Sequence, residues 1–156
     1  MITVGFSSAD TLVSWVIRKV TGSGVSHCFV VHKVLGVECA LEAVASGFRA
    51  IPMSVFAEDN RIADIVSVDS VSLEEEPILG AMLGHPYDFI GLFGFLWVML
   101  GRRLGRQWSN PAGGPGKLFC SEAVVRVLAA AGVPGASLLD PEQCSPEDVL
   151  RFLKRS

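Results

Sequence analysis

The sequence predicts a single α+β domain in which helices lie before, between and after the strands of a central antiparallel sheet. Three observations support this. A chain of 156 residues is long enough for one domain with its own core. Runs rich in β-branched residues alternate with segments whose apolar residues recur at helical spacing. The dipeptide Leu35-Gly36 is typical of a tight turn between two strands, which makes them antiparallel neighbours.

The first part of the chain is predicted to form a strand and then a helix. Residues 2–6 form the strand, and a helix then runs to about Val20 with an apolar stripe of Val13, Val16, Ile17 and Val20. The side chains that supply N-cap chemistry are Ser7, Ser8 and Asp10. Residues 22–24, Gly-Ser-Gly, end the helix.

Four strands and several helices are predicted to follow. The strands are residues 25–34, 37–43, 48–51 and 62–68, all rich in β-branched or apolar residues. Ser72 and Glu75 form a capping-box pattern that opens a helix ending near Gly84. A further helix begins at Cys120 and stops at Gly132, and the last is opened by Ser145 and Pro146.

Composition limits the classes of partner and compartment. Half of the residues are hydrophobic, the mean hydropathy is +0.46 and the formal net charge is −3. With no basic cluster, we expect no nucleic-acid partner. The N-terminal residues lack a signal-peptide profile, so we expect a cytoplasmic protein. The four cysteines lack a Cys-X-X-Cys spacing, which favours reduced thiols over a disulfide framework.

The longest apolar run extends from Phe89 to Leu100 and includes Gly91 and Gly94. It is too short to span a bilayer, which takes about 20 residues. We therefore predict a helix with one face against the core. The alternative is a helix in peripheral contact with a membrane, a lipid or the substrate.

Cys120 lies where a helix is predicted to begin. After it, Val124, Val127, Leu128 and Ala131 follow the i, i+3, i+4, i+7 pattern of an amphipathic helix. Unpaired backbone N–H groups and the helix dipole favour a thiolate at this position, and the thiolate is the nucleophilic form. The alternative is a buried cysteine that acts as a small hydrophobic residue.

A two-residue turn at Leu35-Gly36 would pair residues whose numbers sum to 71, which sets Glu42 opposite Phe29. His27 and Phe29 share one strand face, so Glu42 lies diagonal to His27, at about 7–8 Å between Cα atoms. A carboxylate there can orient an imidazole. Cys28, the next residue, faces away. The alternative is a partly exposed histidine and a solvated glutamate.

A metal site is a competing interpretation, because Cys28, His32 and Cys39 share the other face of this hairpin. Residues 28 and 32 are four positions apart on one strand, a separation of about 13 Å. One zinc ion with bonds near 2.0–2.3 Å cannot bridge that span. We therefore expect no metal and no other cofactor.

Five segments in order resemble the circularly permuted branch of the NlpC-type papain-like hydrolases, in particular YiiX-like proteins, with lecithin retinol acyltransferase as a more distant relative. The segments are residues 21–27 (TGSGVSH), 41–43 (LEA) with Gly47, 84–89 (GHPYDF), 119–122 (FCSE) and 144–149 (CSPEDV). They cover nearly the whole chain. The histidine strand precedes the cysteine helix, as in the permuted order.

The resemblance implies a permuted papain-like fold with Cys120 as nucleophile, His27 as base and Glu42 as its orienting partner. Tyr87 matches a tyrosine that helps to hold the oxyanion in this family; otherwise it is a core aromatic residue. We interpret His85 as structural, and the residue at position 88 as the cap of the helix that follows.

These residues indicate a cysteine hydrolase or acyltransferase that acts on an amide or ester through an acyl-enzyme. Cell-wall peptide amides are the first substrate class, because the wider family works on them. Lipid esters or amides are the second, because the apolar segment from Phe89 to Leu100 would line a groove. The third alternative is a binding or structural module that keeps the fold without activity.

Overall fold

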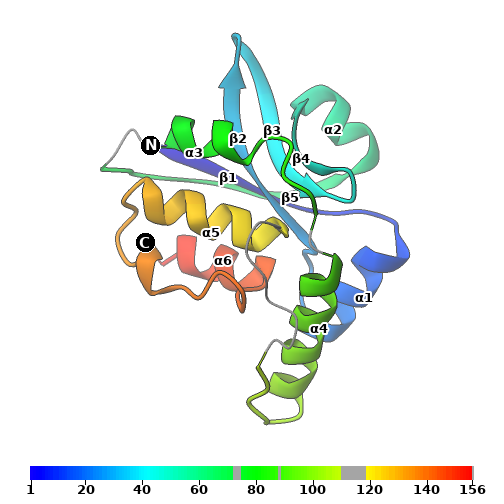
Figure 1. The fold of residues 1–156 in the computed structure, drawn as a ribbon. Helices are drawn as coiled ribbons and strands as arrows, with labels where there is room; N and C mark the ends of the chain where they lie inside the picture. The colour runs from blue at the N-terminus through cyan, green and yellow to red at the C-terminus, as the bar shows by residue number, and fades with distance from the viewer. Residues whose placement is uncertain (72–74, 88, 110–118, 156) are drawn as a thin grey trace.

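The computed structural model describes residues 1–71, 75–87, 89–109 and 119–155, which form a five-stranded sheet with helices on both faces (Figure 1). The strands are β1 (Ile2–Ser8), β2 (His27–Val34), β3 (Val37–Val44), β4 (Gly47–Pro52) and β5 (Arg61–Val68). Their order in the sheet is β4-β3-β2-β1-β5, and each neighbouring pair is antiparallel. The predicted α+β class with an antiparallel sheet is confirmed.

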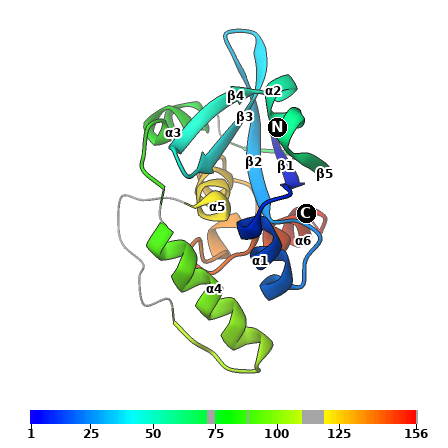
Figure 2. The same ribbon diagram turned by 90° about the vertical axis from the view of Figure 1, so that its right-hand side faces the viewer.

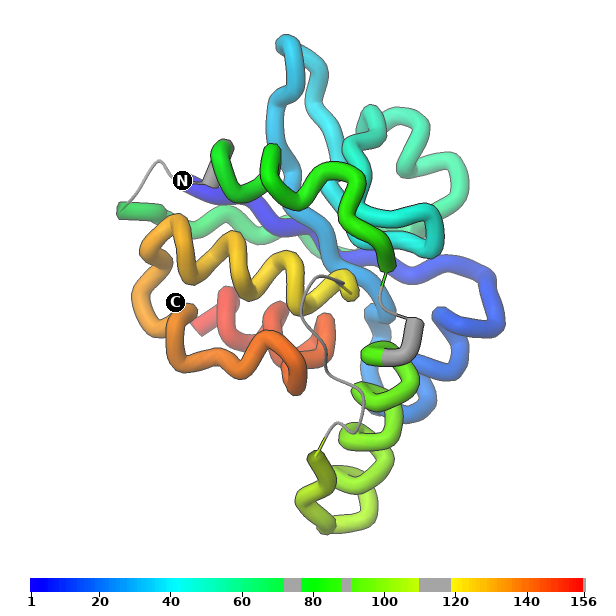
Figure 3. Tube along the Cα trace, in the orientation of Figure 1, coloured from blue at the N-terminus to red at the C-terminus, as the bar shows by residue number. Residues whose placement is uncertain are grey.

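The helices divide into three groups. They are α1 (Leu12–Thr21), α2 (Met53–Asp59), α3 (Glu75–Met82), α4 (Phe89–Arg103), α5 (Cys120–Ala130) and α6 (Pro146–Leu153), with a 3-10 turn at Ala136–Leu138. The layer of α3, α5 and α6 covers one face of the sheet, whereas α2 packs on the other (Figure 2). Helices α1 and α4 lie side by side at one end of the molecule (Figure 3).

The main core lies between the sheet and α5. It joins alternate residues of the strands to the inner face of the helix, and fully buried members include Val4, Phe6, Val124, Val127 and Leu128. A smaller cluster under α2 contains Phe29, Ala40 and Phe56. A third cluster joins α1 to α4 and to Phe119, the residue before the nucleophile candidate. Two of the three clusters therefore adjoin the start of α5.

The predicted hairpin register is confirmed. Val34 pairs with Val37, His32 with Cys39 and Val30 with Leu41. The turn has φ 50° at Leu35 and 83° at Gly36. Positive φ at both central positions is the signature of a type I′ turn, whose twist matches the flanking strands.

The predicted start of α1 was wrong. Ser7 and Ser8 belong to β1, and Thr11 caps the helix by accepting a hydrogen bond from the Ser14 backbone N–H at 3.2 Å. The stripe was also partly wrong, because Val13 is exposed. It lies at the edge of a cavity, whereas the helix buries the predicted Ile17 and, in addition, Ser14.

Other predictions differ in extent or fall outside the described residues. The sequence did not predict α2, which has seven residues, no side-chain cap and only Phe56 buried. A helix this short shows no periodic stripe to detect. The predicted capping residue Ser72 and the predicted cap at position 88 lie outside the described residues.

Helix α4 carries the apolar run and continues to Arg103. Its inner face is buried through Leu92, Phe95, Val98 and Met99, as predicted for a helix packed on the core. Across the described part of the chain, no helix combines the length and apolar character that a membrane span requires.

Candidate active site

The imidazole of His27 is hydrogen-bonded to a buried carboxylate on the neighbouring strand. His27 Nε2 lies 2.8 Å from Glu42 Oε2. Glu42 is only 2% exposed, and the His27 side chain is 17% exposed. The hairpin register therefore brings together the two residues that the sequence predicted to be neighbours.

Arg49 on β4 holds the other oxygen of this carboxylate. It is paired directly with Glu42 across the β3–β4 ladder, and its Nε and Nη2 lie 3.0 and 2.8 Å from Oε1. Two donors on Oε1 and the imidazole on Oε2 therefore hold both oxygens of the carboxylate. Sequence reasoning missed Arg49, although the same counting about a two-residue turn at positions 45–46 would have found it.

Aromatic side chains support the ring of His27 from the α2 side of the sheet. Its centroid lies 6.2 Å from that of Phe29 and 6.4 Å from that of Phe56, with the rings nearly parallel. The two phenylalanines are themselves 4.3 Å apart. Helix α2 therefore has a role in the site, because it supplies Phe56.

Cys120 is the first residue of α5, as predicted, and it is 5% exposed. Phe119 is the N-cap, and its side chain does not cap the backbone N–H groups of the first turn. The Cys120 sulfur and the His27 ring line the same cavity and lie close enough for each to shift the pKa of the other. Since Nε2 is bonded to Glu42, Nδ1 is the ring nitrogen left for the sulfur.

The two residues reach one another around the end of β2. Helix α5 covers the sheet face that carries Cys28 and Val30, whereas His27 packs with Phe29 on the opposite face. His27 is the first residue of β2, so its side chain is not separated from the start of α5 by the sheet. The contact depends on both elements starting at the same edge of the domain.

The electrostatics of the site favour a thiolate and an imidazolium. Burial by itself would lower the pKa of His27, but the hydrogen bonds to Cys120 and Glu42 and the charges of both raise it from 6.5 to about 9. Burial would raise the pKa of Glu42, but His27 and Arg49 together lower it, so the carboxylate is ionised at neutral pH.

A second thiol contacts the nucleophile candidate. The largest influence on the pKa of Cys120 is a hydrogen bond from the Cys28 thiol, which lowers it. Burial raises this pKa, whereas His27 and the Cys28 backbone N–H lower it. The pKa of Cys120 is therefore well below its ordinary range. Burial and the adjacent Cys120 sulfur raise the pKa of Cys28 well above its usual range.

The expectation that Cys28 faces away from the site was therefore wrong. Cys28 does face away from His27, but its face of the sheet is the one that α5 covers. Its fully buried thiol consequently meets Cys120 at the start of that helix.

Gly47 lets a distant segment approach β4 and bring Tyr87 to the site. The Phe48 N–H donates to the His85 carbonyl at 2.8 Å, and the Gly84 N–H donates to the Phe48 carbonyl at 2.9 Å. A Cβ on Gly47 would lie 2.7 Å from the His85 oxygen, and φ at Gly47 is 110°. The His85 backbone thus has the structural role predicted for this residue.

These groups open into one cavity of about 380 Å³. Its lining includes His27, Glu42, Cys120 and Tyr87, with the apolar side chains of Ile17 and Leu92. A substrate in this cavity would touch the sulfur and the imidazole together.

Two further motif residues hold the start of α5. The Ser121 hydroxyl donates to the Cys144 carbonyl at 2.6 Å, which ties α5 to the turn before α6. That turn ends in a capping box between Ser145 and Asp148. These side chains support the site without lining the cavity that holds Cys120.

Comparison with known proteins shows which solved structure this fold resembles. No family model and no curated protein matches the sequence. The structure is similar to that of metalloprotein YiiX from Escherichia coli O157:H7, with a TM-score of 0.57 and 22% identity. The similarity covers 83% of this chain and 64% of the YiiX chain, so this chain spans less than two thirds of that protein. The chain therefore has a YiiX-like α+β fold.

The word metalloprotein describes YiiX. Within the part of this chain that the structure describes, no three His, Cys, Asp or Glu side chains are grouped so that they could hold a metal ion. The donors present therefore do not fit a metal site, and we derive no step through a metal.

Proposed function

We propose that this protein is a cysteine hydrolase or acyltransferase of the permuted papain-like type, acting on an amide or ester through Cys120, His27 and Glu42. The observation that carries the proposal is that Cys120, His27, Glu42 and Arg49 line one cavity, in which Glu42 is hydrogen-bonded to both His27 and Arg49. The order along the chain, histidine strand before cysteine helix, is the permuted one.

In the first half of the reaction the Cys120 thiolate attacks the substrate carbonyl carbon, and a C–S bond forms as the carbonyl oxygen becomes an oxyanion. The tetrahedral intermediate then collapses, and the C–N or C–O bond of the substrate breaks. The His27 imidazolium gives its proton to the leaving amine or alkoxide. The products are a thioester on Cys120, the departed amine or alcohol, and a neutral imidazole.

In the second half water, or an acceptor alcohol or amine, attacks the thioester carbonyl, and His27 takes the proton from the attacking group. The C–S bond breaks and Cys120 leaves as the thiolate, which restores the thiolate–imidazolium pair. Glu42 keeps the ring oriented and stabilises its positive charge throughout, as the third member of a triad does.

The oxyanion would be held at the start of α5. The Cys120 backbone N–H belongs to the first turn, where N–H groups have no partner within the helix. Tyr87 lines the same cavity and would donate its hydroxyl hydrogen from another direction. The loss of one such donor typically slows the reaction by about 10²–10³-fold.

Two substrate classes follow from this site. Cell-wall peptide amides are the class that the sequence resemblance implies. Lipid esters or amides are favoured by a specific observation: Val13, Ile17, Leu92 and Phe93 give the cavity beside Cys120 an apolar wall. An acyl chain would gain more from this wall than a polar peptide would.

The proposal is tested by trapping the acyl-enzyme. The purified protein is incubated with p-nitrophenyl acetate, p-nitrophenyl decanoate and an alanyl p-nitroanilide, and intact mass with peptide mapping follows. We expect an acyl adduct on Cys120 that is absent from Cys120→Ala and strongly reduced in His27→Ala, while the matched variant His32→Ala keeps it.

Alkylation separates an active site from a silent module of the same fold. Iodoacetamide at about pH 6 should modify Cys120 much faster than the other cysteines, because an ordinary thiol near pKa 8.5 is then almost fully protonated. Burial, with nearby carboxylates, raises the pKa of Cys144 to about 11, which makes it the matched comparison. Equal rates at the two cysteines, with no adduct from any ester, would contradict the proposal.

A further inference from the structure

The end of the molecule formed by α1 and α4 carries an apolar surface that the core does not use. On α4 the inner residues Leu92, Phe95 and Met99 are buried, but a second stripe points outward. Its members are spaced at i, i+4, i+7 and i+11 and are between 40% and 70% exposed: Phe93, Trp97, Leu100 and Leu104. Four large side chains in one exposed row exceed the scatter of single apolar residues that is normal on a surface.

Helix α1 extends this surface. It packs beside α4 through Ile17 and Val20, and Leu12, Val13 and Trp15 are more than half exposed. On α4 the exposed row lies away from the buried face, whereas Val13 of α1 lies one turn before Ile17 and borders the cavity together with Phe93. Val13 and Phe93 line one cavity and Trp15 lines a recess with Arg103, so exposed residues of the two helices adjoin, and we call them together the α1–α4 surface.

Tryptophan is concentrated at this end. The chain has three tryptophans: Trp15 and Trp97 belong to the surface, and Trp108 stacks on Trp97 with ring centroids 4.2 Å apart. A Cβ on Gly101 would lie 2.7 Å from the Trp108 ring, so the glycine lets this indole lie against α4. Tryptophan is the side chain that favours the boundary between an apolar phase and water.

Three cations lie beside the α1–α4 surface, and one of them, Arg103, also borders a recess lined by Glu147 and Asp148. Arg18, Lys19 and Arg103 line a recess of about 510 Å³ together with Trp15, and none of the described residues that line it is a carboxylate. Arg103 donates to the Lys19 carbonyl, and Arg18 Nε is buried with no hydrogen-bond partner among the described residues.

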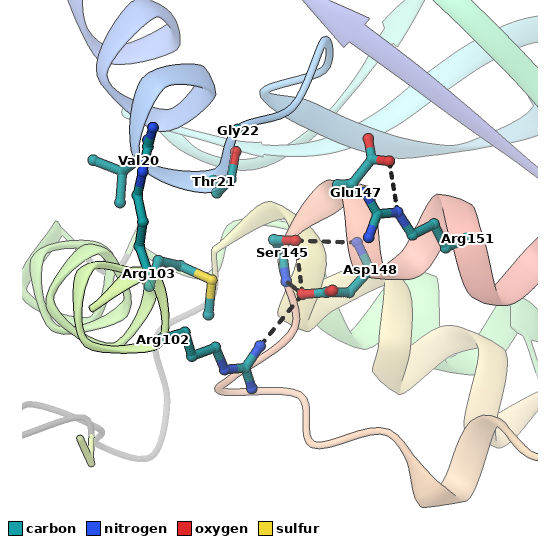
Figure 4. Close-up of a pocket in the computed structure, with 10 residues that line it drawn as sticks. Val20, Thr21, Gly22, Arg102, Arg103, Ser145, Glu147, Asp148 and Arg151 are labelled. Carbon is teal, nitrogen blue, oxygen red and sulfur yellow. Dashed lines mark hydrogen bonds and ion pairs between the residues drawn. The ribbon is translucent and has the colours of Figure 1, made fainter. Parts of the chain in front are cut away.

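Arg102, one residue earlier, has a different arrangement. Its Nη1 lies 3.6 Å from Asp148 Oδ2, and Figure 4 shows its side chain turned toward α6 while Arg103 extends beside Val20 of α1. The cations of the recess, Arg18, Lys19 and Arg103, therefore lie on the α1 side of α4, although the chain as a whole has a formal charge of −3.

We propose that the α1–α4 surface docks on an anionic phospholipid bilayer, with the exposed apolar row at the level of the headgroups and Arg18, Lys19 and Arg103 on lipid phosphates. Apolar area combined with attraction to anionic lipid is what gives interfacial helices their membrane affinity. Val13 and Phe93 also line the cavity that holds Cys120, so docking places the cavity mouth at the membrane.

Charge argues against a second copy of the chain as the partner. A two-fold contact through this surface would bring the three cations of each protomer toward those of the other, since such an interface uses the same patch twice. A phosphate-rich surface would neutralise them. The docking itself does not depend on the proposed chemistry, but a lipid substrate entering from the membrane would rest on it.

The test is flotation of the full chain with vesicles of phosphatidylcholine alone and with vesicles that contain about 30% phosphatidylglycerol, at low and high salt. We expect binding to the anionic vesicles that weakens as salt increases. Phe93→Gln with Leu104→Gln should reduce it at least about tenfold, because two large apolar groups are lost. Lys19→Gln with Arg103→Gln, two of the three proposed cations, should cost about fivefold per charge and flatten the salt dependence.

The matched control removes apolar groups at the other end of the molecule. Leu35→Gln with Val37→Thr changes two exposed residues at the tip of the β2–β3 hairpin, far from α4 (Figure 3), and should float like wild type. Circular dichroism shows that each variant is folded.

Three outcomes would overturn the docking proposal: no flotation with anionic vesicles, an equal loss in the hairpin-tip control, or a dimer in sedimentation that the Phe93/Leu104 variant abolishes without any vesicle binding. Cys120→Ala should float like wild type. A protein that floats but forms no acyl adduct would contradict the proposed function alone, and one that forms the adduct but does not float would contradict the docking alone.

Discussion

The charge that Glu42 presents to His27 gives a defined expectation for the Glu42→Gln variant. The pKa of His27 is about 9 instead of 6.5, which corresponds to about 3.5 kcal/mol in favour of the imidazolium at about 1.4 kcal/mol per pH unit. Cys120 and Glu42 both supply this stabilisation of the imidazolium. Glutamine keeps a hydrogen-bond acceptor but loses the charge, and a charge-assisted bond is about twice as strong as a neutral one. We therefore expect a loss of about 1–1.5 kcal/mol, which lowers the pKa of His27 by about one pH unit.

The assay is an NMR titration of the imidazole signals between about pH 5 and 10.5. The chain has three histidines, so the His27 signal can be assigned by its disappearance in His27→Ala. In wild type the signal should titrate near pH 9, and in Glu42→Gln near pH 8. The alkaline limit of acylation should move down in step, because the imidazolium supplies the proton to the leaving group.

The control for this titration is His32→Ala, which should leave the His27 curve unchanged. A His27 midpoint near 6.5 in wild type would refute the electrostatic argument. Identical curves for wild type and Glu42→Gln would also refute it, provided that the variant is folded. We expect it to fold, because Arg49 is half exposed and can be hydrated after the carboxylate is lost.

Further changes test the surroundings of the site. Cys28→Ala removes the thiol hydrogen bond to Cys120 and should slow alkylation of Cys120 near pH 6 by about fivefold, the value of one neutral hydrogen bond; an unchanged rate in peptide mapping would show that this bond is not formed. Gly47→Ala places a side chain where φ is 110° and the backbone of another segment is close, so urea unfolding should show a loss of about 2–3 kcal/mol in the free energy of unfolding. The control is Gly36→Ala, where φ is 83° and no atom lies within contact, with an expected loss of about 1 kcal/mol. Equal losses would contradict the steric argument. Ser145→Ala breaks the capping box and should cost about 1 kcal/mol in the same measurement, and a loss below a few tenths would mean that the cap is replaced.

The hairpin was predictable because its information is local. Two positive-φ positions at Leu35 and Gly36 fix the register, and a period of two then assigns every side chain to a face. The pairing of His27 with Glu42 follows from that register. The helix that begins at Cys120 was likewise visible in its own apolar stripe.

The environment of Cys120 was not predictable in the same way. Which sheet face α5 covers is decided by long-range packing of Val124, Val127 and Leu128, and the strand pattern is consistent with either face. The contact between Cys28 and Cys120 follows only once that choice is known. Helix α2 was missed because its contribution is a single buried side chain, Phe56, which leaves no periodic signal.

The position of His27, Glu42 and Arg49 on two consecutive hairpins has a consequence for the order in which the protein becomes reactive. These three residues are joined by local pairing within β2, β3 and β4, and local contacts close at low entropic cost. Cys120 is supplied by a helix far along the chain and acquires its low pKa only when α5 docks on the sheet. We expect a newly made chain to complete the imidazole–carboxylate pair first, while its thiol is still an ordinary, largely protonated one that oxidants and electrophiles attack slowly.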